Sequence, residues 1–139
     1  MSPHRMVTAP GLAEPSGYAH AVVAEPGTLV YLGGQTAQGS DGAIHGSTIV
    51  EQFDVAMGNV VAALAAAGGR PEHLVFVTVY ATYIAEYRAS LRDLGGVYRR
   101  HLGRHYPAMA LLGVSALFDD AAKIELVGVA VIPRGDLAC

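Results

Sequence analysis

The clearest periodic pattern in the chain is a run of apolar positions that recurs every three or four residues, as on one face of a helix. Its members are Val50, Phe53, Met57, Val60, Val61 and Leu64. Thr48 and Glu51 fit a capping box, in which each side chain accepts a hydrogen bond from the other residue's backbone N–H. Gly68 and Gly69 are typical of the residues that end a helix. The pattern predicts an amphipathic helix between Thr48 and the glycine pair.

Two short strands precede this helix and a third follows it. Residues 18–24 and 28–34 are mostly apolar and flank the turn Glu25-Pro26-Gly27. Residues 36–46 are rich in glycine and indicate a loop. Residues 73–82 are rich in β-branched and aromatic types, which favour a strand.

A second helix and two further strands complete the chain. The helix carries Tyr87, Leu91, Leu94, Tyr98 and Leu102 on one face and ends at Gly103. The Gly95-Gly96 pair weakens its middle by about 1 kcal/mol per glycine. Strands are predicted over 109–116 and 122–132, joined by a turn around Asp119-Asp120.

The element order is therefore ββαβαββ, an α+β arrangement with both helices on one face of a single sheet. We expect one domain over residues 1–139. The last strand carries apolar residues on both sides: Ile124, Leu126, Ala130 and Ile132 point one way, and Val127, Val129 and Val131 the other. A sheet that is apolar on both faces but covered on only one predicts that subunits pack sheet to sheet.

The composition favours self-association and gives no support for a nucleic-acid partner. Of the 139 residues, 52% are hydrophobic and only 15% charged, against about 25% charged in an average chain. The net charge of -3 gives no support for a nucleic-acid-binding face. The lone cysteine is Cys139, the N-terminal segment has no signal-like apolar run, and apolar stretches elsewhere are too short or interrupted to span a bilayer. We expect a cytoplasmic protein with no membrane or nucleic-acid partner.

Several stretches resemble, in order, the reactive-intermediate deaminase family, also called Rid or YjgF. They are Gly33-Gly34-Gln35 after the second strand, Asn59-Val60 and Ala67-Gly68 in and after the first helix, Thr78-Val79-Tyr80 in the third strand, Tyr106-Pro107-Ala108, and Lys123-Ile124-Glu125 in the last strand. The resemblance covers about residues 17–133. It implies a chorismate-mutase-like fold and a homotrimer with the sheets facing inward and small-molecule sites in the clefts between subunits.

The resemblance also implies site residues. Members hydrolyse imines and enamines derived from amino acids: an arginine grips the substrate carboxylate, and a glutamate orients or activates water. The glutamate falls on Glu125, an N-terminal tyrosine on Tyr18, and the turn that completes the pocket on Gly33, Gly34 and Gln35. We take Glu125 and Tyr18 as candidate catalytic residues. Without the resemblance, Glu125 would be a rim carboxylate bonded across the subunit contact, and Tyr18 a packing residue.

The chain departs from the family where the arginine should stand. That position is Met109, followed by the apolar Ala110 and Leu111. A thioether cannot pair with a carboxylate, and losing a bidentate contact costs several kcal/mol of binding. We therefore expect Met109 and Ala110 to contact a less charged substrate than an imino acid. A neighbouring subunit's Arg134, Arg104 or Arg5 could supply a substitute cation.

Two functions stay open. The first is an enzyme that hydrolyses or tautomerises an imine, enamine or enol, with Glu125 as the water-orienting or acid/base residue. The alternative is a non-catalytic trimer that binds a small molecule or a protein. The family's older labels, ribonuclease and translation inhibitor, fit the acidic balance poorly. No cofactor or metal is expected: His101 and His105 have metal-like spacing but no third ligand nearby, and no Lys-Ser/Thr follows Gly33-Gly34 to make a phosphate loop.

Overall fold

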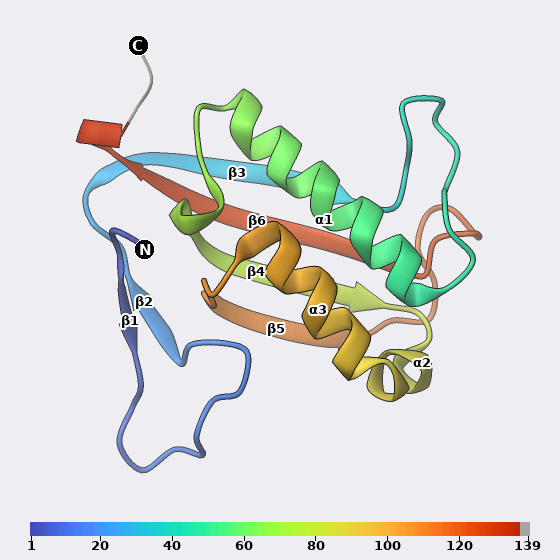
Figure 1. The fold of residues 1–139 in the computed structure, drawn as a ribbon, viewed down its shortest axis with the longest axis horizontal. Coiled ribbons are helices and arrows are strands. Elements are labelled where there is room, and N and C mark those ends of the chain that lie inside the picture. Colours follow the sequence, from blue (N-terminus) through green and yellow to red (C-terminus); the bar gives the residue numbers. More distant parts are fainter. Residues whose placement is uncertain (137–139) are drawn as a thin grey trace.

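The computed structural model describes residues 1–136 and contains a central four-stranded sheet. Its strands lie in the order β3 (Gly27–Gln35), β6 (Ile124–Pro133), β4 (Leu74–Ala81) and β5 (Ala108–Gly113). β4 and β5 are parallel, and the other neighbours are antiparallel. The helices cover one face of this sheet (Figure 1). The predicted α+β class with helices on one face is confirmed.

Helix α1 (Ile49–Ala66) follows its sequence signals closely. The Thr48 hydroxyl accepts a hydrogen bond from the Glu51 backbone N–H at 3.1 Å, and the Glu51 carboxylate accepts one from the Thr48 N–H at 3.0 Å. The chain leaves the helix through Gly68, whose φ of +91° suits glycine. The predicted capping box is therefore present.

By length and composition alone, α1 is long and apolar enough to cross a membrane, whereas we expected the apolar stretches to be too short or too interrupted for this. Such a helix is also what a protein core needs. Its buried residues pack onto the sheet: Ile49, Gln52, Phe53, Ala56, Met57, Val60 and Leu64. The buried Gln52 amide is satisfied, since it donates to the carbonyls of Gly46 and Ala121 and accepts from the Lys123 N–H.

The expected second helix is divided into α2 (Ile84–Ala89) and α3 (Leu91–Leu102). The break is at Ser90, whose ψ of 14° is outside the helical range. The change of direction lets α2 lie over the end of β5, where a Cβ on Gly113 would be 3.6 Å from Ile84. Gly95 and Gly96, expected to weaken the helix, stay within α3.

The N-terminal segment differs most from expectation. Only Ala21–Val23 of the predicted first strand is extended (β2), and it pairs with β1 (Arg5–Val7) instead of β3. His4 explains the pairing, because its Nε2 lies 2.8 Å from the Val131 carbonyl and its Nδ1 accepts from the Glu25 N–H. These bonds hold the N-terminus against the end of β6. Short 3₁₀ turns over Pro71–His73 (η1) and Arg134–Asp136 (η2) complete the described fold.

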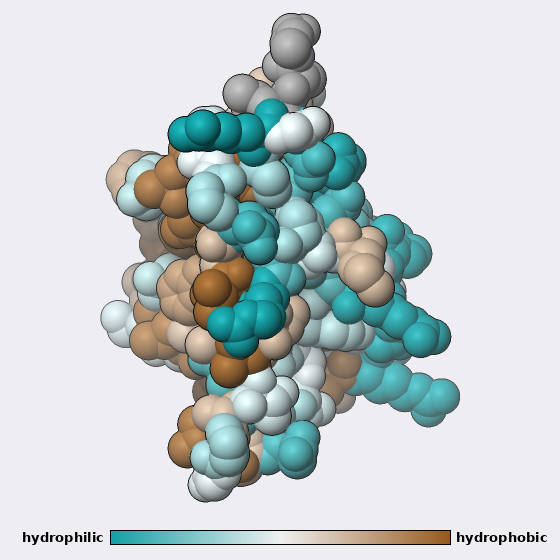
Figure 2. Space-filling view, turned by 90° about the vertical axis from the view of Figure 1, so that its left-hand side faces the viewer, coloured by the Kyte–Doolittle hydropathy of each residue, from teal (hydrophilic) through white to brown (hydrophobic). Residues whose placement is uncertain are grey.

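The sheet has one covered and one open face. In β6, Ile124, Leu126 and Ala130 are fully buried under the helices, and the alternating residues Glu125, Val127 and Val129 point away. Large apolar side chains are exposed on the open face, namely Leu29, Tyr31, Phe76 and Leu112. In the side view of Figure 2, hydrophobic residues gather along the left edge, the side of the open face, and hydrophilic ones opposite. The apolar second face that the sequence indicated is therefore present.

Candidate functional site

A bulge in β3 lies beside the candidate glutamate. The pairing of β3 with β6 shifts between Leu32 and Gln35, so that Gly33 and Gly34 together occupy the space opposite one residue of β6. A Cβ on Gly34 would lie 2.9 Å from the carboxyl carbon of Glu125 and closer still to its Oε2. A Cβ on Gly33 would meet nothing within 4 Å. The bulge thus gives the Glu125 carboxylate room directly against the Gly34 backbone.

Glu125 lies on the open face at the edge of its apolar surface. It is half-buried and pairs across the sheet with Tyr80. It forms no ion pair with any residue between 1 and 136. Ala110 pairs with Thr78, which puts Ala110 on the same face. One chain therefore places Gly34 against Glu125, and it puts Ala110 of the predicted site on the same face but two strands away from Glu125. Because no side chain of residues 1–136 forms an ion pair with it, the carboxylate keeps its oxygens available for water or a ligand.

Met109 lies on the other face of the sheet. It pairs with Val77, which is buried under the helices, and packs against the core. There it lines a cavity of about 650 Å³ between α3 and the sheet. Gln35 also lies on the face opposite to Glu125, because it pairs with the buried Leu126. Its side-chain amide donates a hydrogen bond to the Gly33 carbonyl at 3.5 Å. Within one chain, Met109 and Glu125 are thus separated by the sheet.

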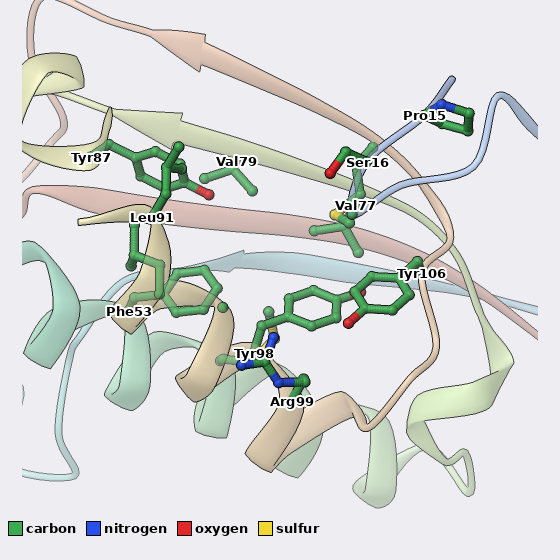
Figure 3. A pocket seen from close by; sticks show the side chains of 15 residues that line it. Pro15, Ser16, Phe53, Val77, Val79, Tyr87, Leu91, Tyr98, Arg99 and Tyr106 are labelled. Carbon is green, nitrogen blue, oxygen red and sulfur yellow. The ribbon is translucent and has the colours of Figure 1, made fainter. Parts of the chain in front are cut away.

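The Met109 cavity is apolar and ringed by aromatic side chains (Figure 3). Val77 and Val79 lie on its sheet side, and Phe53 and Met57 of α1 form a wall. The rings of Tyr98 and Tyr106 stack at one end, with centroids 5.2 Å apart. Burial raises the pKa of the Tyr98 hydroxyl well above its usual value, so that it stays protonated and donates to the His105 carbonyl at 2.6 Å. The stacking and this hydrogen bond fix the two tyrosine rings at one end of the cavity.

One arginine that the sequence did not indicate as a site residue lines this cavity. Arg99 of α3 is exposed and lies four residues after Gly95, where a Cβ would be 3.3 Å from its Nη1. Its spacing from Gly95 and Tyr98 in the sequence indicates that Arg99 lies near the face of α3 that carries these two residues. However, a cation near the C-terminal end of a helix is usually explained by the helix dipole. Of the expected substitutes, Arg104 lines a different cavity, and Arg5 and Arg134 lie in β1 and η2.

Tyr18 lies at the outer edge of β5. Its neighbour Ala19 donates from its backbone N–H to the Pro107 carbonyl at 3.0 Å and forms a bridge with Ala108. The Tyr18 ring contacts His20 edge to face and is 39% exposed. Pro15, Ser16 and Gly17, just before it, line the Met109 cavity. Tyr18 therefore lies nearer to this cavity wall than to the bulge beside Glu125.

The histidines have structural partners. His101 Nε2 lies 2.6 Å from a carboxylate oxygen of Asp54, and His105 Nε2 lies 2.8 Å from the Leu74 carbonyl. They do not converge on a common point. Within residues 1–136, no three His, Cys, Asp or Glu side chains form a group that could hold a metal ion.

Comparison with known proteins supports the fold and the resemblance. The family described as Endoribonuclease L-PSP matches residues 9–132. A Rid-family protein of unknown function from Yersinia pestis, YyfB, has a TM-score of 0.82 at 24% identity, with 92% of this chain and 98% of that chain covered. At that identity the likeness shows the fold alone.

Two further solved structures are similar over most of their length. Rv2704 of Mycobacterium tuberculosis, a member of the YjgF/YER057c/UK114 family, has a TM-score of 0.63 at 25% identity, with 93% of this chain and 99% of that chain covered. Yeast Mmf1 has a TM-score of 0.65 at 26% identity, with 91% and 95% covered. A comparison with curated proteins finds no match.

Proposed function

Since the chain belongs to the Endoribonuclease L-PSP family, the group that includes the Rid and YjgF proteins, we propose that it is a small-molecule enzyme that hydrolyses or tautomerises an imine, enamine or enol. The observation that carries the proposal is the Glu125 carboxylate, which lies against Gly34 without an ion-pair partner among the described residues. A half-buried carboxylate whose oxygens are not engaged in an ion pair can hold a water molecule or move a proton.

In imine hydrolysis, Glu125 accepts a proton from water as the water oxygen bonds to the carbon of the C=N group, and it returns this proton to the nitrogen, which gives a carbinolamine. The hydroxyl proton of the carbinolamine then passes through Glu125 to the nitrogen as the C–N bond breaks, so that a carbonyl forms and ammonia or an amine leaves. In tautomerisation, Glu125 moves a proton between the enol oxygen and carbon. Neither reaction needs a redox partner, so a single acid/base residue is sufficient.

The proposed substrate lacks the carboxylate that an arginine would hold. Met109 stands at that position, and its cavity is lined mainly by apolar and aromatic groups. We infer that imines derived from amino acids are poor substrates. The proposal includes a homotrimer with inward-facing sheets, in which the cleft between subunits adds a second chain's surface to Glu125. The exposed Tyr31 and Phe76 of the open face support such a contact.

The alternative is a trimer that binds a small molecule or a protein without catalysis. The separation of Met109 from Glu125 within one chain favours it, because a single subunit does not assemble both groups in one pocket. An RNA-cleaving role has less support: the net charge is -3, and Arg100 and His101 both contact Asp54.

The experiment that separates these functions is a substrate panel for the purified protein. Imines released by an amine oxidase lack a carboxylate, imino acids released by an amino-acid oxidase carry one, and enol phenylpyruvate tests tautomerisation. We expect faster loss of the neutral imine or the enol than in buffer. Turnover of none of the three would contradict an enzyme and favour the binding module. Fastest turnover of imino acids would contradict the inference from Met109.

A further inference from the structure

A second cavity lies between the N-terminal segment, η1 and the end of α3, which meet at one side of the molecule (Figure 1). Its volume of about 510 Å³ is within the usual range of ligand pockets, about 300–1,000 Å³. We propose that this cavity binds the zwitterion of an α-amino acid with an apolar side chain. The ammonium group of the ligand lies at His105 and Glu72, and its carboxylate lies at Arg104.

His105 offers this cavity a buried nitrogen with a lone pair. The residue is only 9% exposed, and its Nε2 lies 2.8 Å from the Leu74 carbonyl. Because a carbonyl only accepts hydrogen bonds, Nε2 carries the proton and Nδ1 is the acceptor. Burial lowers the pKa of His105, so that the ring stays neutral near neutral pH. Nδ1 has no hydrogen-bond partner within residues 1–136, and since no fully buried side-chain nitrogen there is unpaired, Nδ1 is reached from the cavity.

An ammonium group is the ligand group that fits this nitrogen. Glu72 lines the same cavity, two residues before the Leu74 carbonyl that holds His105. Its Oε1 accepts a hydrogen bond from Arg70 Nε at 2.7 Å, whereas its Oε2 has no hydrogen-bond partner among the described residues. The three N–H groups of an ammonium ion can donate to His105 Nδ1 and to the Glu72 carboxylate together, and the carboxylate supplies the opposite charge.

Arg104 supplies a cation at the rim of this cavity. It is exposed and forms no ion pair with any residue between 1 and 136, whereas Arg100 contacts Asp54 at 3.5 Å. Its guanidinium can hold a carboxylate in two parallel hydrogen bonds. Arg104 and His105 are adjacent in the chain, so the anionic and cationic groups of the ligand must also be close together. A carboxylate and an ammonium group on one carbon atom meet this condition.

The rest of the lining favours an apolar side chain on the ligand. Leu102 is buried at the end of α3, Met6 is half-buried in β1, and Tyr106 is half-buried beside them. Methionine side chains adapt to the shape of an apolar group. Both ring nitrogens of His4 are bonded to backbone groups, so His4 adds a wall but no polar partner. A branched aliphatic side chain such as that of leucine suits these walls.

This site is separate from the Met109 cavity and from the chemistry proposed for Glu125. The two cavities share one lining residue, Tyr106. Binding at Arg104 needs neither an active Glu125 nor turnover of any substrate. A failure of either proposal therefore leaves the other standing.

The four methionines of the chain report which cavity is filled. Met1 and Met6 line the proposed site, whereas Met57 and Met109 line the other cavity. NMR of protein labelled on the methionine methyl groups would follow titration with three compounds. They are L-leucine, N-acetyl-L-leucine, which lacks the ammonium group, and L-leucinamide, which lacks the carboxylate. We expect L-leucine to shift Met6 but not Met57 or Met109, and to bind about fivefold or more tightly than either derivative.

Arg104→Gln is the informative variant, and Arg100→Gln is its matched control because Arg100 is an exposed arginine outside the cavity. We expect Arg104→Gln to remove the preference for L-leucine over L-leucinamide, and Arg100→Gln to keep it. Glu72→Gln should reduce the preference for L-leucine over N-acetyl-L-leucine. Unchanged methyl spectra without ligand show that the variants are folded.

The wild type alone decides the proposal if a variant does not fold. No shift of Met6 with L-leucine, shifts of Met57 and Met109 in its place, or equal binding of the three compounds would each overturn the proposal. A preference for L-leucine over L-leucinamide that survives in folded Arg104→Gln would overturn it as well.

Discussion

The carboxylate of Glu125 lies directly against Gly34, at a point where any larger residue in β3 would displace it. The two residues come from strands that are neighbours in the sheet but 91 positions apart in sequence, since 125 − 34 = 91. The β3 bulge places a glycine at this position and keeps the carboxylate on the open face. This contact links a turn motif of the sequence to the group proposed to do the chemistry.

The bulge can be tested with two adjacent substitutions. In Gly34→Ala, the new methyl group would push the Glu125 carboxylate aside, whereas in Gly33→Ala it would meet nothing. Since the displaced atoms end a flexible side chain, we expect the stability of both variants to change by about 1 kcal/mol or less. Turnover should fall roughly ten- to a hundredfold in Gly34→Ala only. Equal rates in the two variants would show that the Gly34 contact does not position Glu125.

The missing arginine predicts a gain of function. In Met109→Arg a guanidinium could hold a substrate carboxylate, and we expect hydrolysis of imino acids from an amino-acid oxidase to rise by about tenfold or more. Met109→Leu keeps an apolar side chain and should show no rise. A gain would also indicate that position 109 of one chain reaches the Glu125 of another, because within one chain the sheet separates them. Imino-acid hydrolysis by the wild type at the variant's rate would contradict this prediction.

The open face predicts the oligomeric state. We expect native mass spectrometry to find a homotrimer, since an exposed apolar sheet face is stabilised by contact with another copy. Tyr31 lies on this face with 76% of its surface exposed, so Tyr31→Asp should dissociate the assembly. Phe118 is equally apolar but fully exposed outside the named strands, and Phe118→Asp is the control that should leave the trimer intact. A monomeric wild type would refute the expected assembly.

The buried His105 predicts a loss of stability in mild acid. Burial lowers the pKa of His105 from its ordinary value of 6.5, while the unfolded chain keeps that value. The unfolded state therefore binds more protons as the pH falls below 6.5, and the free energy of unfolding decreases. Urea denaturation at pH 5.5 and 7.5 should show this decrease in the wild type. The decrease should be smaller in His105→Gln, which can still donate to the Leu74 carbonyl. An equal decrease in both proteins would exclude His105 as its source.

The sequence predicted those features that depend on local chemistry. The Thr48–Glu51 capping box and the alternation along β6 both concern residues a few positions apart, and both are present. The break at Ser90 and the pairing of β2 with β1 depend on contacts with distant segments, such as that of His4 with Val131. Local pattern does not encode such contacts.

The relative positions of the site residues could not be predicted from sequence either, because they too depend on contacts between distant segments. Alternation shows which residues of one strand share a face, but the register between strands decides which face that is. Glu125 and Met109 lie on different strands, and only their pairing with Tyr80 and Val77 shows that they point in opposite directions. The sequence did not indicate Arg99 because the cavity that it lines is formed by several elements that are far apart in the sequence.

Glu125→Gln tests most directly whether Glu125 is the group that moves the proton or orients the water. The amide keeps the size of the side chain but cannot accept a proton. With the substrate that the wild type turns over fastest, we predict a loss of at least about a hundredfold in kcat/KM and an unchanged unfolding temperature. A variant that retains the wild-type rate would contradict the claim.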